Sequence, residues 1–135
     1  MRDAYFGLVF SYAADKFQDA IGIDAAYRES TGCTLYLVED HKFFLAELKE
    51  NQPIKVEMRL LNYDEKRLHL MHQMFKADGE LAATNELMIL HVNLNTRKAC
   101  AFPKNILSEI TSIALIDAPK PKPKQIGQTI AIPRR

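Results

Sequence analysis

Several residue types that mark common protein classes are scarce in this sequence. Only five glycines occur, and they form no phosphate-binding glycine loop. No apolar run approaches the roughly 20 residues that a membrane helix needs, so we expect no membrane partner. The 18 basic and 17 acidic residues leave a formal net charge of +1, which gives no bulk attraction for nucleic acid.

Cysteine is also scarce, and Cys33 and Cys100 lie far apart in the sequence. Asp3 and many polar residues interrupt the start of the chain, so it does not read as a secretory signal. We therefore predict a cytoplasmic protein whose two cysteines are reduced thiols. A single disulfide between them is the alternative interpretation.

The residues that are present suit one soluble globular domain. The 135 residues are 47% hydrophobic and 26% charged, which is enough to bury a core without disulfides. A helix is predicted over residues 3–21, and further apolar residues in its first half lead us to expect burial on most sides. Gly22 is placed to end this helix in a left-handed conformation. The apolar face consists of Phe6, Phe10, Ala13, Phe17 and Ala20.

The middle of the chain is predicted to form an antiparallel sheet. Residues 54–60 alternate apolar and charged side chains, which is the period of a strand. Asp78-Gly79 is a strong tight-turn signal. Short connections between consecutive strands favour an antiparallel meander. The predicted strands cover residues 34–45, 54–60, 66–76, 81–94 and 99–102.

A second helix is predicted over residues 103–118, and a tail rich in proline and lysine follows it. Proline holds the backbone extended over residues 119–124. We therefore divide the chain into one domain over residues 1–118 and a linker or mobile arm over residues 119–135, of which residues 126–132 can dock back. The lysines of the tail are interpreted as solvated, or as a contact for an acidic ligand or partner.

Together these elements predict an α+β fold in which a curved antiparallel sheet wraps around one long helix. A cone or a two-layer sandwich is also physically possible. Short motifs narrow this choice. They are Asp3-Ala4-Tyr5-Phe6 with Phe10-Ser11-Tyr12-Ala13, Glu39-Asp40-His41 with Phe44-Leu45 and Glu47, Tyr63-Asp64 with Lys66-Arg67-Leu68-His69, and Ala83-Thr84-Asn85-Glu86 with Leu90-His91-Val92.

Over residues 1–102 these motifs resemble the hotdog-fold acyl-CoA thioesterases of the 4-hydroxybenzoyl-CoA thioesterase type. The closest resemblance is to the betainyl-CoA thioesterase-like branch of carnitine breakdown. The resemblance implies hydrolysis of an acyl-CoA thioester with a short polar or quaternary-ammonium acyl group. It also implies a homodimer or homotetramer that uses no cofactor.

One part of the family pattern is expected to be missing. The family has a first strand and an Asp-Tyr-Asn-Gly-His-Met loop before the long helix, and the Asp of that loop is its expected catalytic carboxylate. This chain begins with Met1-Arg2-Asp3, which matches the last Met of the loop. We therefore expect an unpaired sheet edge where the first strand would pair.

Three residues are predicted to take part in catalysis. Thioester hydrolysis needs a carboxylate that activates water and donors for the charge on the thioester oxygen. The resemblance places the backbone amide of Asp3 at the helix N-terminus, where unpaired amides stabilise such charge. Glu39 and His41 are expected on the same strand face as Leu35 and Leu37. Burying polar groups on such an apolar face costs free energy, which favours a functional role for the two residues. Alternatively, the two pair with each other, or a bulge turns them outward.

Five residues are predicted to bind the substrate. Tyr5, Phe10 and Phe43 are expected to form an aromatic wall around a trimethylammonium group, with ordinary core packing as the alternative. Ser11 is expected to hydrogen-bond the substrate or a water, or else its own helix. Arg67 is a candidate for the phosphates of coenzyme A, unless it is a solvated strand end.

No metal site is predicted. His69 and His72 are three residues apart on a strand and face opposite sides, and His91 stands alone on its strand. No cysteine or carboxylate cluster with zinc spacing accompanies them. Glu86 has either a second catalytic role or a structural one. The alternatives to a thioesterase are a non-catalytic hotdog module that binds an acyl-CoA or a protein, and a dehydratase-type hotdog enzyme.

Overall fold

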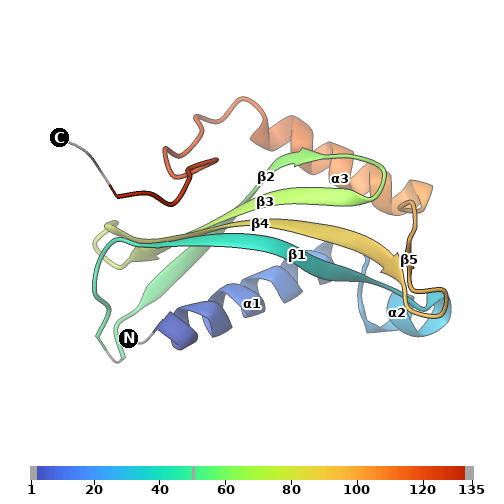
Figure 1. The fold of residues 1–135 in the computed structure, drawn as a ribbon, viewed down its shortest axis with the longest axis horizontal. Helices are drawn as coiled ribbons and strands as arrows, with labels where there is room; N and C mark the ends of the chain where they lie inside the picture. Colours follow the sequence, from blue (N-terminus) through green and yellow to red (C-terminus); the bar gives the residue numbers. More distant parts are fainter. Residues whose placement is uncertain (1–2, 50, 133–135) are drawn as a thin grey trace.

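The computed structural model describes residues 3–49 and 51–132 and has the α+β architecture that the sequence predicts (Figure 1). A curved antiparallel sheet lies against one long helix. No helix in the described residues is both long and apolar enough to cross a membrane. In chain order the elements are α1 (Asp3–Ala20), α2 (Ala25–Thr31), β1 (Cys33–Phe44), β2 (Ile54–Tyr63), β3 (Arg67–Lys76), β4 (Leu81–Asn93), β5 (Lys98–Ala99) and α3 (Lys104–Asp117).

The strands follow the order β1-β4-β3-β2, and β5 pairs with the end of β4. Hairpins join β2 to β3 and β3 to β4, the second through the Asp78-Gly79 turn, in which Gly79 has φ +90°. The predicted meander is confirmed for these three strands. It is wrong for β1, because the connection after β1 is long enough to carry the chain to the other edge of the sheet. Within the described residues, β1 and β2 are therefore the edge strands.

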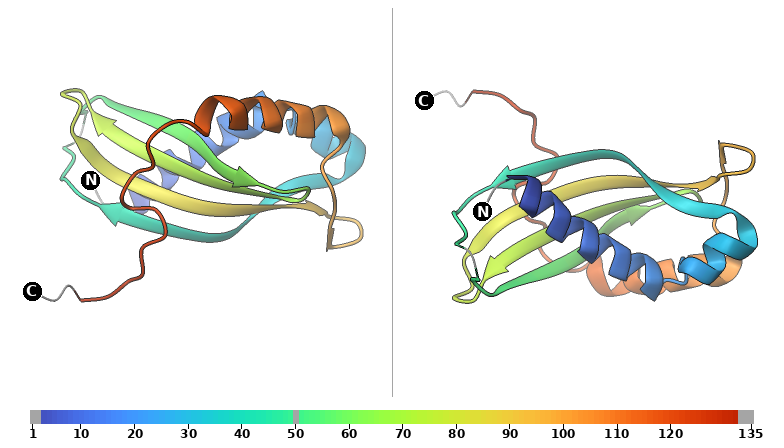
Figure 2. Two further views of the ribbon diagram at one scale, coloured as in Figure 1. Left: turned by 90° about the horizontal axis from the view of Figure 1, so that it is seen from above. Right: turned by 90° about the horizontal axis from the view of Figure 1, so that it is seen from below.

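The helix α1 lies along one face of the sheet, which we call the inner face (Figure 2). Phe6, Phe10 and Phe17 recur along one side of the helix and are at most 7% exposed. Gly22 follows the helix with φ +98°, as predicted. The expectation that the helix is buried on most sides is wrong, because residues on its other side are exposed in the described chain. Its exposed apolar residues are Tyr5, Leu8 and Tyr12.

Two hydrophobic clusters pack between α1 and the inner face. The first surrounds the N-terminal half of α1, and the second joins its C-terminal half to the sheet and to α3. Burial of each large side chain contributes about 1.5–3 kcal/mol. The first cluster consists of Phe6, Phe10, Leu48, Met74, Ala82 and Ala83. The second includes Phe17, Ile21, Leu60, Leu70, Ile89, Ile106 and Ile110.

After α3 the chain turns back across the opposite, outer face of the sheet (Figure 2). The buried guanidinium of Arg59 on β2 donates to the carbonyl oxygens of Lys120 and Pro121. The backbone N–H of Gly127 donates to Glu86 Oε1 at 2.8 Å. The tail therefore docks on the domain through its first half, whereas the isoleucines near its end are exposed.

A buried carboxylate ties α3 to the edge strand β2. Asp117 is the last residue of α3 and is 5% exposed. Its Oδ2 accepts the backbone N–H of Leu60 at 2.9 Å, and its Oδ1 accepts from Lys120 Nζ at 2.8 Å. The carboxylate thus supplies the acceptor that a neighbouring strand would otherwise give to an edge amide.

Replacing this carboxylate should test the tie. Asp117→Ala leaves the buried Leu60 N–H without its acceptor and should lower the free energy of unfolding by about 1–3 kcal/mol. Asp117→Asn keeps an oxygen acceptor and should retain most of the stability. Urea denaturation at pH 7 measures both variants beside the wild type. Equal losses in the two variants would show that the hydrogen bond to Leu60 contributes nothing.

Candidate active site

A cavity of about 380 Å³ lies between α1 and the inner face of the sheet. One side of the helix lines it at spacings of three and four, and alternate residues of the strands line it from the sheet. The helix contributes Gly7, Phe10, Ser11, Ala14, Asp15 and Gln18. The sheet contributes Leu35, Leu37, Asp40, Lys42, His72, Asn85, Leu87 and Ile89. We call this space the inner cavity.

A bulge in β1 decides which side chains reach the inner cavity. The register with β4 shifts between Leu37 and Glu39, so Val38 is an extra residue in the strand. One extra residue reverses the face on which every later side chain lies. After the bulge it is therefore Asp40 and Lys42 that line the inner cavity.

The strand phase expected from the sequence is wrong beyond this bulge. Glu39, His41 and Phe43 do not share a face with Leu35 and Leu37, and of the alternatives considered the outward-turning bulge is the one observed. The three border a hollow of about 1160 Å³ between β1 and tail residues 128–131, and the His41 and Phe43 rings stack at 4.7 Å. Their catalytic and substrate-binding roles stay predictions.

Three polar side chains form a row across the floor of the inner cavity. In the sheet register, Asn85 of β4 lies between Lys42 of β1 and His72 of β3. His72 is fully buried and stacks on Phe10, with ring centroids 5.8 Å apart and planes 7° apart. Among the described residues, neither ring nitrogen of His72 nor Asn85 Oδ1 has a hydrogen-bond partner. Because both residues line the inner cavity, buried hydrogen-bonding groups without a protein partner lie at its floor.

Burial keeps the imidazole of His72 neutral, and the lining of the inner cavity carries a net negative charge. Burial lowers the pKa of His72 to about 4, so its ring is neutral at pH 7 and can both donate and accept a hydrogen bond. Asp40 and Lys42 form an ion pair on the wall, and Asp15 also lines the cavity. Two carboxylates and one ammonium give the lining a formal charge of −1.

The structure brings some of the predicted residues to this cavity and leaves others apart. Phe10 and Ser11 line it together, whereas Tyr5 is 53% exposed in the first turns of α1 and does not. Asp3 begins α1, as the resemblance implied, but its side chain lies outside the described part of the chain. The roles predicted for these four residues stay predictions.

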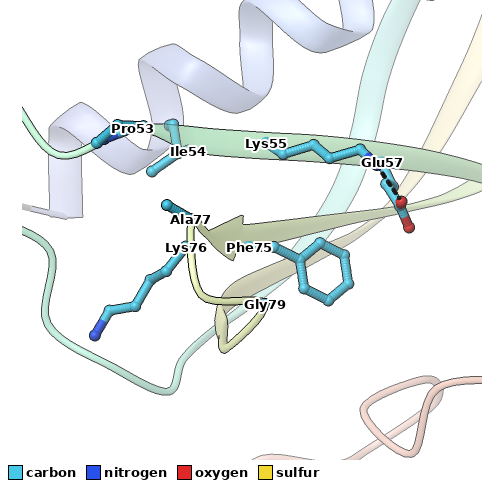
Figure 3. A pocket seen from close by; sticks show the side chains of 8 residues that line it. All are labelled: Pro53, Ile54, Lys55, Glu57, Phe75, Lys76, Ala77 and Gly79. Carbon is cyan, nitrogen blue, oxygen red and sulfur yellow. Dashed lines mark ion pairs between the residues drawn. The ribbon is translucent and has the colours of Figure 1, made fainter.

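Two other hollows are weaker candidates for a functional site. Arg67 pairs with Asp64 at 2.7 Å beside a hollow of about 220 Å³, and the predicted coenzyme A contact of Arg67 stays a prediction. Another hollow of about 520 Å³ lies at the ends of β2 and β3, where Lys55 pairs with Glu57 at 3.1 Å (Figure 3). None of the unpartnered buried polar atoms in the described residues lines either one. The inner cavity is therefore the better candidate.

Sequence reasoning misses His72 and Asn85 as site residues. Each interrupts an apolar alternation, since His72 shares a face with Leu70 and Met74 and Asn85 shares one with Leu87. A polar residue on such a face is a recognisable signal, because its burial is costly. That the two residues are neighbours becomes visible only once the strands are paired.

Comparisons with known proteins bear on this arrangement. The Thioesterase-like superfamily matches residues 1–110. A betainyl-CoA thioesterase of Pseudomonas aeruginosa is 36% identical over 134 residues, which are 98% of this chain and 84% of that protein. An L-carnitine dehydrogenase/betainyl-CoA thioesterase of Agrobacterium fabrum is 42% identical over 99 residues, which are 73% of this chain and 20% of that protein.

A solved structure supports the same fold. A protein of Staphylococcus aureus in complex with CoA has a TM-score of 0.95 and 35% identity to this chain. The match covers 98% of this chain and 84% of that chain. The hotdog fold predicted from the motifs is therefore confirmed.

The free energy of unfolding should depend on pH because the imidazole of His72 is buried. Unfolded histidine has a pKa near 6.5 and folded His72 one of about 4, so the folded state binds fewer protons between these values. The contribution of His72 to stability is fully present above about pH 6.5, and about 3 kcal/mol is lost as pH falls to about 4. His72→Leu should remove this loss and, by filling the site with apolar atoms, should not destabilise the chain at pH 7.

Urea denaturation at a series of pH values measures this effect. His41→Gln, on the outer face of β1, controls for the removal of a histidine as such, whereas His69 is unsuitable because it pairs with Glu86 at 2.7 Å. If both variants flatten the pH dependence equally, His72 is not the responsible group.

Proposed function

Because the chain belongs to the Thioesterase-like superfamily, we propose that it hydrolyses acyl-CoA thioesters to coenzyme A and a carboxylic acid. The observation that carries this proposal is the 36% identity with a betainyl-CoA thioesterase across 98% of the chain. The substrate class is then a short acyl group with a quaternary ammonium, as in betainyl-CoA. The corresponding role is a cytoplasmic step of carnitine breakdown.

The inner cavity has features that suit a quaternary ammonium group. Its lining carries the carboxylates of Asp15 and Asp40 against the single ammonium of Lys42, so its net charge attracts a cation. The ring of Phe10 adds an aromatic surface, and a cation near such a ring gains about 0.5–2 kcal/mol. A trimethylammonium group has no N–H to donate, so it needs no hydrogen-bond acceptor of its own.

The chemical step can be assigned to groups around this cavity. Water attacks the thioester carbon, negative charge develops on the carbonyl oxygen, the C–S bond breaks and the sulfur of coenzyme A takes a proton. Neutral His72 and the side-chain amide of Asn85 are donors for the carbonyl oxygen, together with the predicted Asp3 amide at the start of α1. Asp40 is the proposed base that takes the proton from water, and its ion pair with Lys42 orients it.

We further propose that the chain works as a homodimer. The edge strand β1 exposes more than half of Tyr36, Leu37 and Val38, and α1 exposes Tyr5 and Tyr12 beside it. An unpaired strand edge next to exposed apolar side chains supports association with a second copy. Sedimentation equilibrium distinguishes this state from a monomer and from a homotetramer.

A pair of matched substrates tests the acyl preference. Betainyl-CoA and 3,3-dimethylbutyryl-CoA have the same shape, but only the first carries a positive charge. We expect kcat/KM for betainyl-CoA to be about tenfold higher or more, after division by the rate of hydroxide hydrolysis of each thioester. Release of coenzyme A is followed with a thiol reagent. Equal corrected kcat/KM values for the two substrates would show that the positive charge of the acyl group is not recognised. If coenzyme A is released from neither thioester, a non-catalytic binding module is favoured.

Two neighbouring carboxylates test where the chemistry lies. Asp40 lines the inner cavity as well as the hollow beside the tail, whereas Glu39 lines that hollow but not the inner cavity, so their amide variants form a matched pair. Asp40→Asn should lower kcat by about 10²–10⁴-fold, the usual effect of losing a general base, and Glu39→Gln should change kcat far less.

The same assay measures both variants, with the melting temperature as a control for folding. A large loss in Glu39→Gln alone would move the reaction to the outer face, as the sequence-based prediction has it. Comparable large losses in both would leave Asp40 without a distinct role.

A further inference from the structure

A second polar cluster lies outside the inner cavity, at the end of the sheet next to α2 (Figure 1). It consists of Cys33 at the start of β1, His91 on β4 and Cys100 directly after β5. The two sulfur atoms are 3.6 Å apart, and Cys100 Sγ lies 3.4 Å from His91 Nδ1. Cys33 and His91 are buried, and Cys100 is partly exposed. One donor atom from each residue lies within 4.8 Å of the other two.

The sheet register places the two cysteines on opposite sides of β4. Val92 and Asn93 each pair with β1 on one side and with β5 on the other. Their sulfur atoms nonetheless lie 3.6 Å apart, which is longer than the S–S bond of about 2.05 Å in a disulfide. The two cysteines are free thiols in this structure. The spacing leaves room for an atom between the sulfurs.

Two of the three distances between the donor atoms match the edges of a tetrahedral metal site. With Zn–S bonds of about 2.3 Å and Zn–N bonds of about 2.0 Å, a tetrahedron has edges of about 3.8 Å between sulfurs and about 3.5 Å between sulfur and nitrogen. The distance between the sulfurs here is 3.6 Å, that between Cys100 Sγ and His91 Nδ1 is 3.4 Å, and the donor atoms of Cys33 and His91 lie within 4.8 Å of each other. Thiolate and imidazole ligands together favour zinc over calcium or magnesium.

The surroundings of His91 allow its Nδ1 to bind a cation. Without a metal, Nδ1–H donates to the carbonyl oxygen of Cys100 at 2.8 Å, and Nε2 accepts from the hydroxyl of Tyr27 at 2.8 Å. If Nδ1 binds a metal, it gives up its hydrogen bond to the Cys100 carbonyl oxygen, and the ring proton moves to Nε2 and is donated to the oxygen of Tyr27. A hydroxyl serves both arrangements, because it can donate or accept. Phe102 packs against the ring at 4.8 Å and limits its rotation.

We propose that Cys33, His91 and Cys100 bind one thiophilic divalent cation, of which Zn²⁺ is the biological candidate. Binding converts both thiols to thiolates and releases two protons to solvent, so charge and atoms balance. A water molecule takes the fourth position, which the partial exposure of Cys100 leaves accessible. The ion joins the ends of β1, β4 and β5 and stands apart from the thioester chemistry.

The sequence alone does not indicate this metal site. Cys100 is nine residues from His91 and 67 from Cys33, and neither spacing belongs to a zinc motif. The sequence-based prediction of no metal site considered local spacing alone. The pairing of β4 with strands on both sides brings the ligands together.

Cobalt provides a direct readout that does not depend on enzymatic activity. The purified, reduced full chain is titrated with Co²⁺, and we expect one equivalent to produce visible bands of tetrahedral cobalt and a near-ultraviolet sulfur-to-cobalt band. Added Zn²⁺ should displace the cobalt and protect both thiols from alkylation, as counted by mass spectrometry. At about a hundred times its Kd, Zn²⁺ should raise the melting temperature by roughly 8 °C.

Three variants and one control locate the site. Cys33→Ser and Cys100→Ser each leave one thiolate and should lose the tetrahedral spectrum. Tyr27→Phe should keep that spectrum but bind about 10–100-fold more weakly, because it loses the group that orients His91. His41→Gln, on the outer face, should bind cobalt like the wild type. Thermal melts of the metal-free variants report whether each has folded.

Two results would overturn the proposal. One is the absence of a tetrahedral cobalt spectrum from the wild-type chain, or the persistence of that spectrum in both cysteine variants. The other is a chain that binds no metal and instead loses two hydrogens on mild oxidation with glutathione disulfide, which would make the cluster a redox-active cysteine pair. Protection of both thiols by Zn²⁺ needs no variant, so misfolding of a mutant cannot hide either outcome.

Discussion

Strand β4 is hydrogen-bonded along both of its edges, to β1 on one side and to β3 and β5 on the other. Double pairing fixes its register, since a slip of one residue would turn every side chain to the opposite face. Both polar clusters on the inner face depend on this register. β4 supplies Asn85 to the inner cavity and His91 to the cysteine cluster, so one ladder of backbone hydrogen bonds positions both.

Local pattern is enough to predict most of the elements. The repeat of Phe6, Phe10 and Phe17 gives α1, and Asp78-Gly79 gives the turn between β3 and β4. These signals are strong because each involves residues within a few positions of one another. The placement of β1 beside β4 is different, because it depends on a pairing between distant segments that no local pattern encodes.

The candidate site shows a sharper limit of the same reasoning. Val38 is as good a strand residue as its neighbours, so the sequence carries no sign that it is the extra residue of a bulge. That one residue moves Glu39 and His41 to the outer face and brings Asp40 and Lys42 to the inner cavity. Resemblance to a family predicts the reaction well, but the assignment of single residues needs the strand register.

The unpartnered pair of His72 and Asn85 constrains how this sequence can change over generations. Under selection for stability alone, a buried polar residue without a protein partner is readily replaced by an apolar one. Retention of both residues in a lineage therefore requires selection on whatever occupies the inner cavity. Because the two are neighbours in the register, loss of one frees the other to change. A descendant that abandons its ligand should turn apolar at both positions together.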